Sequence, residues 1–191
     1  MISAILLAAG QSKRMNGENK LAKEIQGIPL LKLSVKNILA SSINELVIVL
    51  GYQKEIIEKL IDKHKKIKIV FNKNFENGMA SSIKTGLLHC SEKSEAFFIC
   101  LGDMPLVNHN IYNQLIKSKY NKKIIVPTYK GQQGNPVLFD KSMKDNIMNI
   151  LGDTGAKKIL ELNKDKILNL EINDQSIAKG FDTQDNFNPL Y

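Results

Sequence analysis

The segment 6–20 (LLAAGQSKRMNGENK) combines small side chains with two cations, a pattern that could bind a triphosphate. Small side chains let a ligand approach the main chain, Gly10 can adopt torsions that other residues avoid, and successive amides in such a loop form a concavity for anions. Arg14, the only arginine of the chain, and Lys20 would place a planar guanidinium and a compact ammonium beside it. The residues predicted to contact the nucleotide here are Leu7, Ala8, Ala9, Gly10, Ser12, Arg14 and Lys20. The alternative is an ordinary strand-to-helix turn, because the segment matches neither Gly-x-Gly-x-x-Gly nor the P-loop.

Asp103 is the second residue that could carry chemistry. It follows the apolar run 96–101 and Gly102, so its carboxylate would leave the carboxyl end of a buried strand. A carboxylate there can hold Mg²⁺, which prefers a few carboxylates together with phosphate oxygens and water. The alternative is a turn aspartate that hydrogen-bonds to its own main chain.

Two further polar residues are candidates for contacts to the nucleotide. Ser82 lies in the first turn of a helix predicted over 79–90, where unpaired amides attract anions, although plain capping is an alternative. Asn72 follows the predicted strand 67–71 and is a weaker candidate, since a structural turn role suits it at least as well.

Apolar runs alternate with amphipathic stretches, and these elements must position the candidate residues. Such alternation predicts an α/β fold, a single-domain three-layer sandwich with a mostly parallel, Rossmann-like sheet that helices cover on both faces. Because ligands of these sheets bind beyond the carboxyl ends of the strands, the 8–20 loop and the 102–105 turn are expected on one rim. The predicted strands are 2–7, 45–50, 67–71, 96–101, 124–127, 136–139 and 167–172, and the predicted helices are 30–40, 55–61, 79–90, 108–119, 141–150 and 156–162.

Composition narrows the class of protein. The net charge of +8 suits nucleic acid or an anionic small molecule, but aromatic residues are only 6% and tryptophan is absent, so nucleic-acid binding is not expected. No apolar run approaches the ~20 residues that span a bilayer, and no basic segment precedes the first apolar run. We therefore expect a cytoplasmic protein that does not bind membranes. The two cysteines and three histidines lack the spacing of a zinc site.

Six ordered motifs resemble those of one family, the molybdenum cofactor cytidylyltransferases with their MobA-like nucleotidyltransferase domain. The first motif begins Leu-Ala-Ala-Gly, as in the cytidylyltransferase branch, rather than Leu-Ala-Gly-Gly, as in the guanylyltransferase branch. Three positions depart from the family pattern. Gly180 stands where the first aspartate of Asp-x-Asp is usual, Gln184 where proline is usual, and Lys157 where arginine is usual. The motifs are 7–21 (LAAGQSKRMNGENKL), 78–87 (GMASSIKTGL), 101–105 (LGDMP), 134–139 (GNPVLF), 152–157 (GDTGAK) and 180–185 (GFDTQD).

The resemblance implies a nucleotidyltransferase, one domain over 1–191, that transfers CMP from CTP to the phosphate of a molybdopterin-type cofactor and releases pyrophosphate. Arg14, Lys20 and Asp103 would be catalytic, and Asp103 and Asp182 would bind Mg²⁺. A molybdenum apo-enzyme would be a further partner. The residues implied on the acceptor side are Asn135, Pro136 and Asp153. The alternatives are a sugar or polyol phosphate acceptor, GTP in place of CTP, and a maturation factor that binds cofactor without catalysis.

Overall fold

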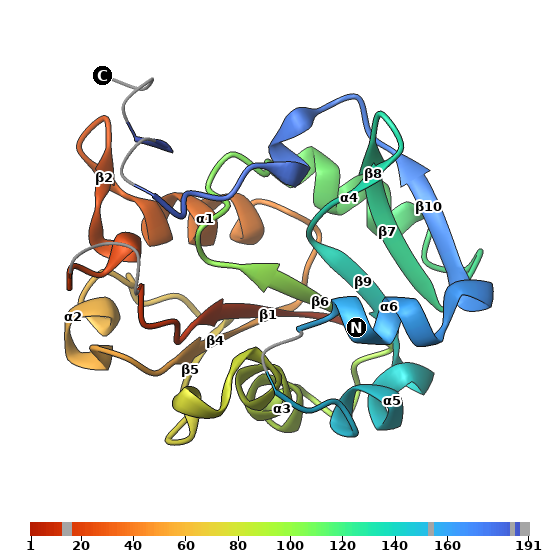
Figure 1. The fold of residues 1–191 in the computed structure, drawn as a ribbon, viewed down its shortest axis with the longest axis horizontal. Helices are drawn as coiled ribbons and strands as arrows, with labels where there is room; N and C mark the ends of the chain where they lie inside the picture. The colour runs from red at the N-terminus through yellow and green to blue at the C-terminus, as the bar shows by residue number, and fades with distance from the viewer. Residues whose placement is uncertain (13–16, 153–154, 184–185, 188–191) are drawn as a thin grey trace.

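A computed structural model describes residues 1–12, 17–152, 155–183 and 186–187. Its centre is an eight-stranded sheet in the order β10-β7-β9-β6-β1-β4-β5, with β8 paired to β7 (Figure 1). The strands are β1 Ile2–Ala8, β4 Glu45–Leu50, β5 Ile67–Phe71, β6 Ala96–Leu101, β7 Ile124–Tyr129, β8 Gln132–Gln133, β9 Val137–Asp140 and β10 Ile167–Glu171, with a separate hairpin of β2 Glu24–Ile25 and β3 Ile28–Pro29. The α-helices are α1 Leu30–Leu39, α2 Lys54–Glu58, α3 Met79–His89, α4 His109–Lys117, α5 Lys144–Met148 and α6 Lys157–Leu162. The 3₁₀ helices are η1 Lys20–Ala22, η2 Phe75–Asn77, η3 Lys141–Met143, η4 Lys164–Lys166 and η5 Gln175–Ala178.

The predicted α/β fold with a mostly parallel sheet is confirmed. The strand β1 pairs in parallel with β4 and β6, β4 with β5, and β7 with β10. The exception among the predicted strands is β9, which runs antiparallel between β6 and β7. Only the segment 130–136 joins β7 to β9, and a parallel crossover needs about a dozen residues or more, so the chain must turn back on itself.

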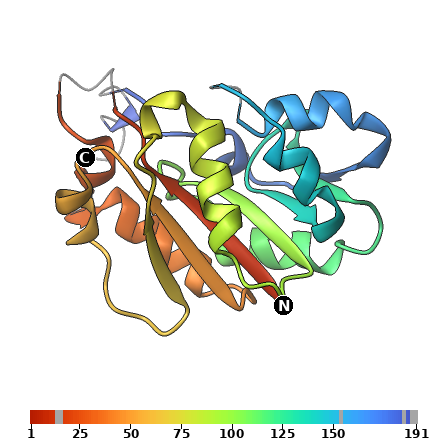
Figure 2. The same cartoon turned by 90° about the horizontal axis from the view of Figure 1, so that it is seen from below.

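Helices cover both faces of the sheet, as the alternating pattern predicts. In Figure 1, α1 and α4 lie above the sheet and α3 and α5 lie below it, and Figure 2 shows α3 crossing the lower face. The first core holds buried residues of α1, α2 and α4, and the second holds buried residues of α3, α5 and α6. In β1, Leu6 faces the first core and Ile5 the second, so the central strand is apolar on both sides.

Some predicted helices are shorter than expected. The predicted helix 55–61 is α2, which ends at Glu58, and the predicted helix 141–150 divides into η3 and α5. Within the described residues, no helix has both the length and the apolar character that crossing a bilayer requires.

The close approach of α3 to β1 depends on a glycine and gives a first prediction. A Cβ atom at Gly86 would lie 2.3 Å from Ile5 Cγ2 and 3.0 Å from Val49 Cγ2. We expect Gly86→Ala to lower the free energy of unfolding by about 1–2 kcal/mol, because overpacking costs ~1–3 kcal/mol and exceeds the gain in helix propensity. Thermal denaturation followed by circular dichroism measures this change. The control is Leu88→Ala in the same helix, at a position 63% exposed; a neutral Gly86→Ala would contradict the packing described here.

Candidate active site

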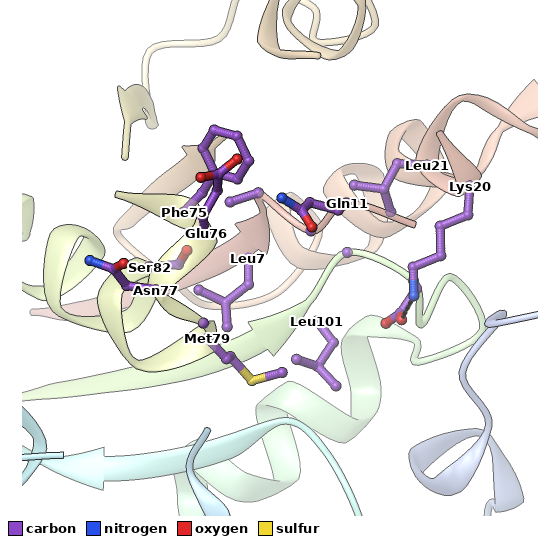
Figure 3. Close-up of a pocket in the computed structure, with 15 residues that line it drawn as sticks. Leu7, Gln11, Lys20, Leu21, Phe75, Glu76, Asn77, Met79, Ser82 and Leu101 are labelled. Atoms are coloured by element: carbon purple, nitrogen blue, oxygen red, sulfur yellow. Dashed lines mark hydrogen bonds and ion pairs between the residues drawn. The ribbon is translucent and has the colours of Figure 1, made fainter. Parts of the chain in front are cut away.

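A cleft of about 490 Å³ opens at the carboxyl ends of β1 and β6. The loops after both strands form its floor, and η2 and the start of α3 form one wall. Figure 3 shows Phe75, Asn77 and Ser82 on one side and Lys20 on the other. The loop after the first strand and the Asp103 turn thus share one rim, as predicted. The lining residues are Leu7, Ala9, Gly10, Gln11, Lys20, Leu21, Phe75, Glu76, Asn77, Gly78, Met79, Ser82, Leu101, Gly102 and Asp103.

Lys20, Asp103 and Asp182 form a charged cluster at one end of this cleft. The Lys20 ammonium donates to Asp103 Oδ2 and to Asp182 Oδ1, the latter at 2.5 Å. The side chains of Lys20 and Asp103 are 16% and 15% exposed, whereas that of Asp182 is 50% exposed. We call these three residues the carboxylate–lysine cluster. It brings together residues from three distant parts of the chain.

The start of η1 fixes the main chain of Lys20. The Lys20 amide donates to Ser12 Oγ at 3.1 Å, and the Leu21 amide donates to the capping oxygen Asn19 Oδ1 at 3.1 Å. Leu21 is buried in the first core and anchors this short helix. Ser12 has a φ of 49°, in the left-handed region, so the main chain turns at this residue. Ser12 therefore positions Lys20 rather than lining the cleft.

Hydrogen bonds from two sides hold the turn that carries Asp103. From α1, Ser34 Oγ donates to the Gly102 carbonyl at 2.9 Å and Asn37 Nδ2 donates to the Pro105 carbonyl at 2.8 Å. From the carboxyl-terminal segment, the Phe181 amide donates to the Asp103 carbonyl at 2.9 Å, which brings Asp182 next to the turn. These contacts fix the main chain on both sides of the Asp103 carboxylate.

Burial and charge act in opposite directions on the pKa values of the cluster. Burial raises the pKa of Asp103, and this effect outweighs the opposing effect of Lys20, while the nearby Asp182 raises the pKa further. Burial alone would lower the pKa of Lys20, but the two carboxylates outweigh it and the pKa of Lys20 is raised. The ammonium therefore stays protonated at neutral pH, and Asp103 carries its negative charge in an unfavourable environment.

The cluster fits a hard divalent cation. Asp103 Oδ1 is buried and has no hydrogen-bond partner among the described residues. A Cβ atom at Gly180 would lie 3.6 Å from Asp182 Oδ2 and 3.9 Å from Asp103 Oδ2, so both carboxylates face the same small space. Carboxylate oxygens are the donors that Mg²⁺ prefers. Within the described part of the chain, no group of three or more His, Cys, Asp or Glu forms an alternative metal site.

Only some of the other residues predicted to contact the nucleotide line the cleft. Ala9 and Gly10 line the cleft, and Ser82 lines it from α3. Ala8 is buried, 1% exposed, beneath the loop. Asn72 is 3% exposed and braces the wall instead, because its Nδ2 donates to Ser82 Oγ at 3.0 Å and its Oδ1 accepts from the Asn74 amide at 2.9 Å.

Of the predicted acceptor-side residues, the two that the structure describes, Asn135 and Pro136, do not line this cleft. The Asn135 amide donates to the Ile177 carbonyl at 2.8 Å, and Pro136 is buried. Arg14 and Asp153 lie outside the described residues. The sequence did not single out the lining residues Phe75 and Glu76, which lie between Asn72 and the 78–87 motif. Other lining residues lie inside the motifs but were not predicted as site residues: Gln11, Leu21, Gly78, Met79, Leu101 and Gly102.

Solved structures share this fold over nearly the whole chain. The Rv0371c protein of Mycobacterium tuberculosis H37Rv has a TM-score of 0.87 at 20% identity, covering 99% of this chain and 96% of that one. A manganese complex of that protein has a TM-score of 0.81 at 19% identity, with 99% and 96% covered. A nucleotidyl transferase from Methanothermobacter thermautotroptrophicus has a TM-score of 0.82 at 15% identity, with 99% and 95% covered. These likenesses show that the chain shares its fold with proteins of known structure.

The chain belongs to the MobA-like NTP transferase domain family, whose model matches residues 4–168. Bifunctional protein GlmU of Thermosipho africanus is 29% identical over 85% of this chain and 36% of that protein. A probable molybdenum cofactor guanylyltransferase of Methanosarcina mazei is 28% identical over 76% of this chain and 66% of that protein. Nicotine blue oxidoreductase of Paenarthrobacter nicotinovorans is 24% identical over 95% of this chain and 92% of that protein. The alignments with the first two relatives thus span less than two thirds of their length.

Proposed function

We propose that the protein transfers a nucleotidyl group from a nucleoside triphosphate to the phosphate of a molybdopterin-type cofactor and releases pyrophosphate. The observation that carries this proposal is the single cleft that contains the small-residue loop, the Lys20 ammonium and the Asp103 carboxylate. The relatives named molybdenum cofactor guanylyltransferases support the acceptor. A molybdenum apo-enzyme would then receive the product.

The proposed reaction is an in-line displacement at the α-phosphorus. An oxygen of the acceptor phosphate forms a new bond to this atom, the bond from the α-phosphorus to the bridging oxygen of the β-phosphate breaks, and pyrophosphate leaves with the electron pair. A phosphate nucleophile is already ionised at neutral pH and needs no general base. This agrees with a cleft that no histidine or cysteine of the described residues lines. Catalysis is then positioning and charge neutralisation, with Lys20 and, by proposal, Arg14 on the triphosphate.

The cation that we propose for the cluster is Mg²⁺, held by Asp103 and Asp182. When bound, it would neutralise charge on the phosphate oxygens. The protein contributes the fixed turn around Asp103 and the adjacent segment that carries Asp182.

We propose CTP as the nucleotide, on the basis of Ala9. Ala9 lines the cleft, is 5% exposed and packs closely against Gly51, where an added Cβ atom would lie 2.7 Å from Ala9 Cβ. A methyl group at this position leaves less room for the larger guanine base. GTP is the second candidate, and the names of two relatives favour it.

The choice of base gives a second prediction. We expect Ala9→Gly to improve binding of GTP relative to CTP about tenfold, since one methyl group in a pocket changes discrimination by ~1–3 kcal/mol. Isothermal titration with each nucleotide and Mg²⁺ measures the ratio. The control is Ala22→Gly in η1, which does not line the cleft. An unchanged ratio in Ala9→Gly would remove Ala9 as the basis for CTP.

The test of the proposed function has two stages. A thermal-shift panel of CTP, GTP, ATP and UTP with Mg²⁺ identifies the nucleotide, and pyrophosphate release is then measured with molybdopterin-type, sugar and polyol phosphates. We expect release with the molybdopterin-type acceptor. Release only with a sugar or polyol phosphate would replace the acceptor, and binding of the pterin phosphate without pyrophosphate release from any nucleotide would indicate a non-catalytic maturation factor.

A further inference from the structure

The position of the Lys20 ammonium suggests a role beyond binding phosphate. It lies between Asp103 Oδ2 and Asp182 Oδ1, the two carboxylates that we propose as metal ligands. We propose that Lys20 is an internal counter-cation that occupies this place until a triphosphate draws it away, so that a divalent cation binds weakly alone and tightly with the nucleotide. The inference depends on the proposed function only for the triphosphate.

The first argument is competition for the same oxygens. Two cations that share a pair of carboxylates at hydrogen-bond distance repel each other, and the low polarity around buried groups strengthens this repulsion. The side chains of Lys20 and Asp103 are 16% and 15% exposed, so water screens the pair only weakly. A cation that enters alone must therefore displace the ammonium.

The second argument concerns where the displaced ammonium can go. Apart from Asp103, the carboxylate among the described lining residues of the cleft is Glu76, which Figure 3 shows on the opposite wall from Lys20. The hydrogen bond from the Lys20 amide to Ser12 Oγ holds the base of the side chain in place. Without an anionic ligand, the ammonium would leave two carboxylates for a cleft in which the described lining residues offer it no other carboxylate on the same wall. Triphosphate oxygens in the cleft would supply the missing partner.

The third argument concerns Asp103 Oδ1, a carboxylate oxygen to which the ammonium does not donate. Asp103 Oδ1 is buried without a hydrogen-bond partner among the described residues, so the cluster keeps one carboxylate oxygen for a further cation. Lys20 compensates only part of the negative charge of the two carboxylates. Because coupling between two ligands is reciprocal, a triphosphate that moves Lys20 raises the affinity for the metal, and the metal raises the affinity for the triphosphate equally.

The test measures Mn²⁺ binding without nucleotide, from the electron paramagnetic resonance signal of free Mn²⁺. We expect Lys20→Met to bind Mn²⁺ at least tenfold more tightly than the native protein. The matched control is Lys23→Met, because Lys23 is close in the chain but pairs with Glu18 at 3.0 Å, outside the cluster. Equal or weaker Mn²⁺ binding by a folded Lys20→Met protein would overturn the proposal.

A second measurement tests the proposal if Lys20→Met does not fold in the absence of metal. If removal of Lys20 leaves the carboxylates too strongly repelled, millimolar Mn²⁺ should restore the circular dichroism of Lys20→Met, since the metal replaces the ammonium. A Lys20→Met protein that stays unfolded in Mn²⁺ contradicts the proposal. Neither readout uses nucleotide or acceptor, so absence of pyrophosphate release from the native protein would overturn the proposed function and leave this result standing.

Discussion

Asp103→Asn is expected to slow pyrophosphate release at least ~100-fold, the loss typical when one fixed group that stabilises transition-state charge is removed. The amide keeps the shape of the carboxyl group but not the negative charge that a divalent cation requires. The turn should keep its conformation, because its hydrogen bonds from Ser34, Asn37 and Phe181 involve main-chain carbonyls and not the Asp103 side chain. A continuous pyrophosphate assay with saturating nucleotide measures the change.

The same substitution should preserve or raise the melting temperature at pH 7. Burial raises the pKa of Asp103 above its ordinary value of 3.8 despite Lys20. A carboxyl group whose pKa is higher in the folded state binds its proton more tightly there, so its ionised form costs folding stability. This cost is absent below pH 3.8 and develops as the pH rises through the folded pKa. Asparagine avoids it, while Lys20 keeps its partner Asp182.

The control for Asp103→Asn is Asp62→Asn, which removes a surface carboxylate paired with Lys32 at 2.8 Å. This variant should keep full activity, because an exposed ion pair contributes little. A near-normal rate of pyrophosphate release in Asp103→Asn would mean that the reaction does not use this carboxylate. A rate lost together with the fold would instead assign Asp103 a structural role.

Lys20→Ala is expected to reduce pyrophosphate release by about 100-fold and to weaken nucleotide binding in the presence of Mg²⁺. The ammonium is the described cation that lines the cleft, and its raised pKa keeps it charged across the neutral range. Its charge would act on the triphosphate most strongly as pyrophosphate leaves. Steady-state rates at several nucleotide concentrations separate the effect on kcat from that on KM.

Two further variants serve as controls for Lys20→Ala. Lys23→Ala removes a neighbouring lysine that does not line the cleft, and it should keep the native rate. Lys20→Arg keeps the positive charge but not the compact ammonium, so it should restore part of the activity. An unchanged rate in Lys20→Ala would exclude the proposed role in charge neutralisation.

Local features of the sequence predicted the sheet and most of its helices correctly. An apolar run such as 96–101 corresponds to one strand. A strand whose two faces are both covered by helices is apolar along its whole length, and this is why the run marks it. Helix ends were less accurate, because Glu58 ends α2 earlier than its apolar spacing indicates. The reversed direction of β9 was not expected, since strand direction depends on the connection and not on the composition of the strand.

The candidate site was predicted only in part. The parallel sheet that the sequence indicates predicted that the 8–20 loop and the Asp103 turn share one rim, because the carboxyl ends of parallel strands meet there. The wall formed by Phe75 and Glu76 was missed, because these side chains show no periodicity or motif that marks a ligand. For Asn72 the sequence suggested a nucleotide contact, but the structure shows a structural role. Its side chain is hydrogen-bonded to Ser82 and to the Asn74 amide.

The sequence by itself determined the alternation of elements, the small-residue loop and the types of charge that follow it, because these are properties of neighbours along the chain. The family resemblance already paired Asp182 with Asp103. Only the tertiary structure decided that the Phe181 amide links the two segments by donating to the Asp103 carbonyl, and that the Lys20 ammonium lies between the two carboxylates. The physical reason is that hydrogen bonds and charge pairs between distant segments depend on how the layers pack, and no local pattern encodes that distance.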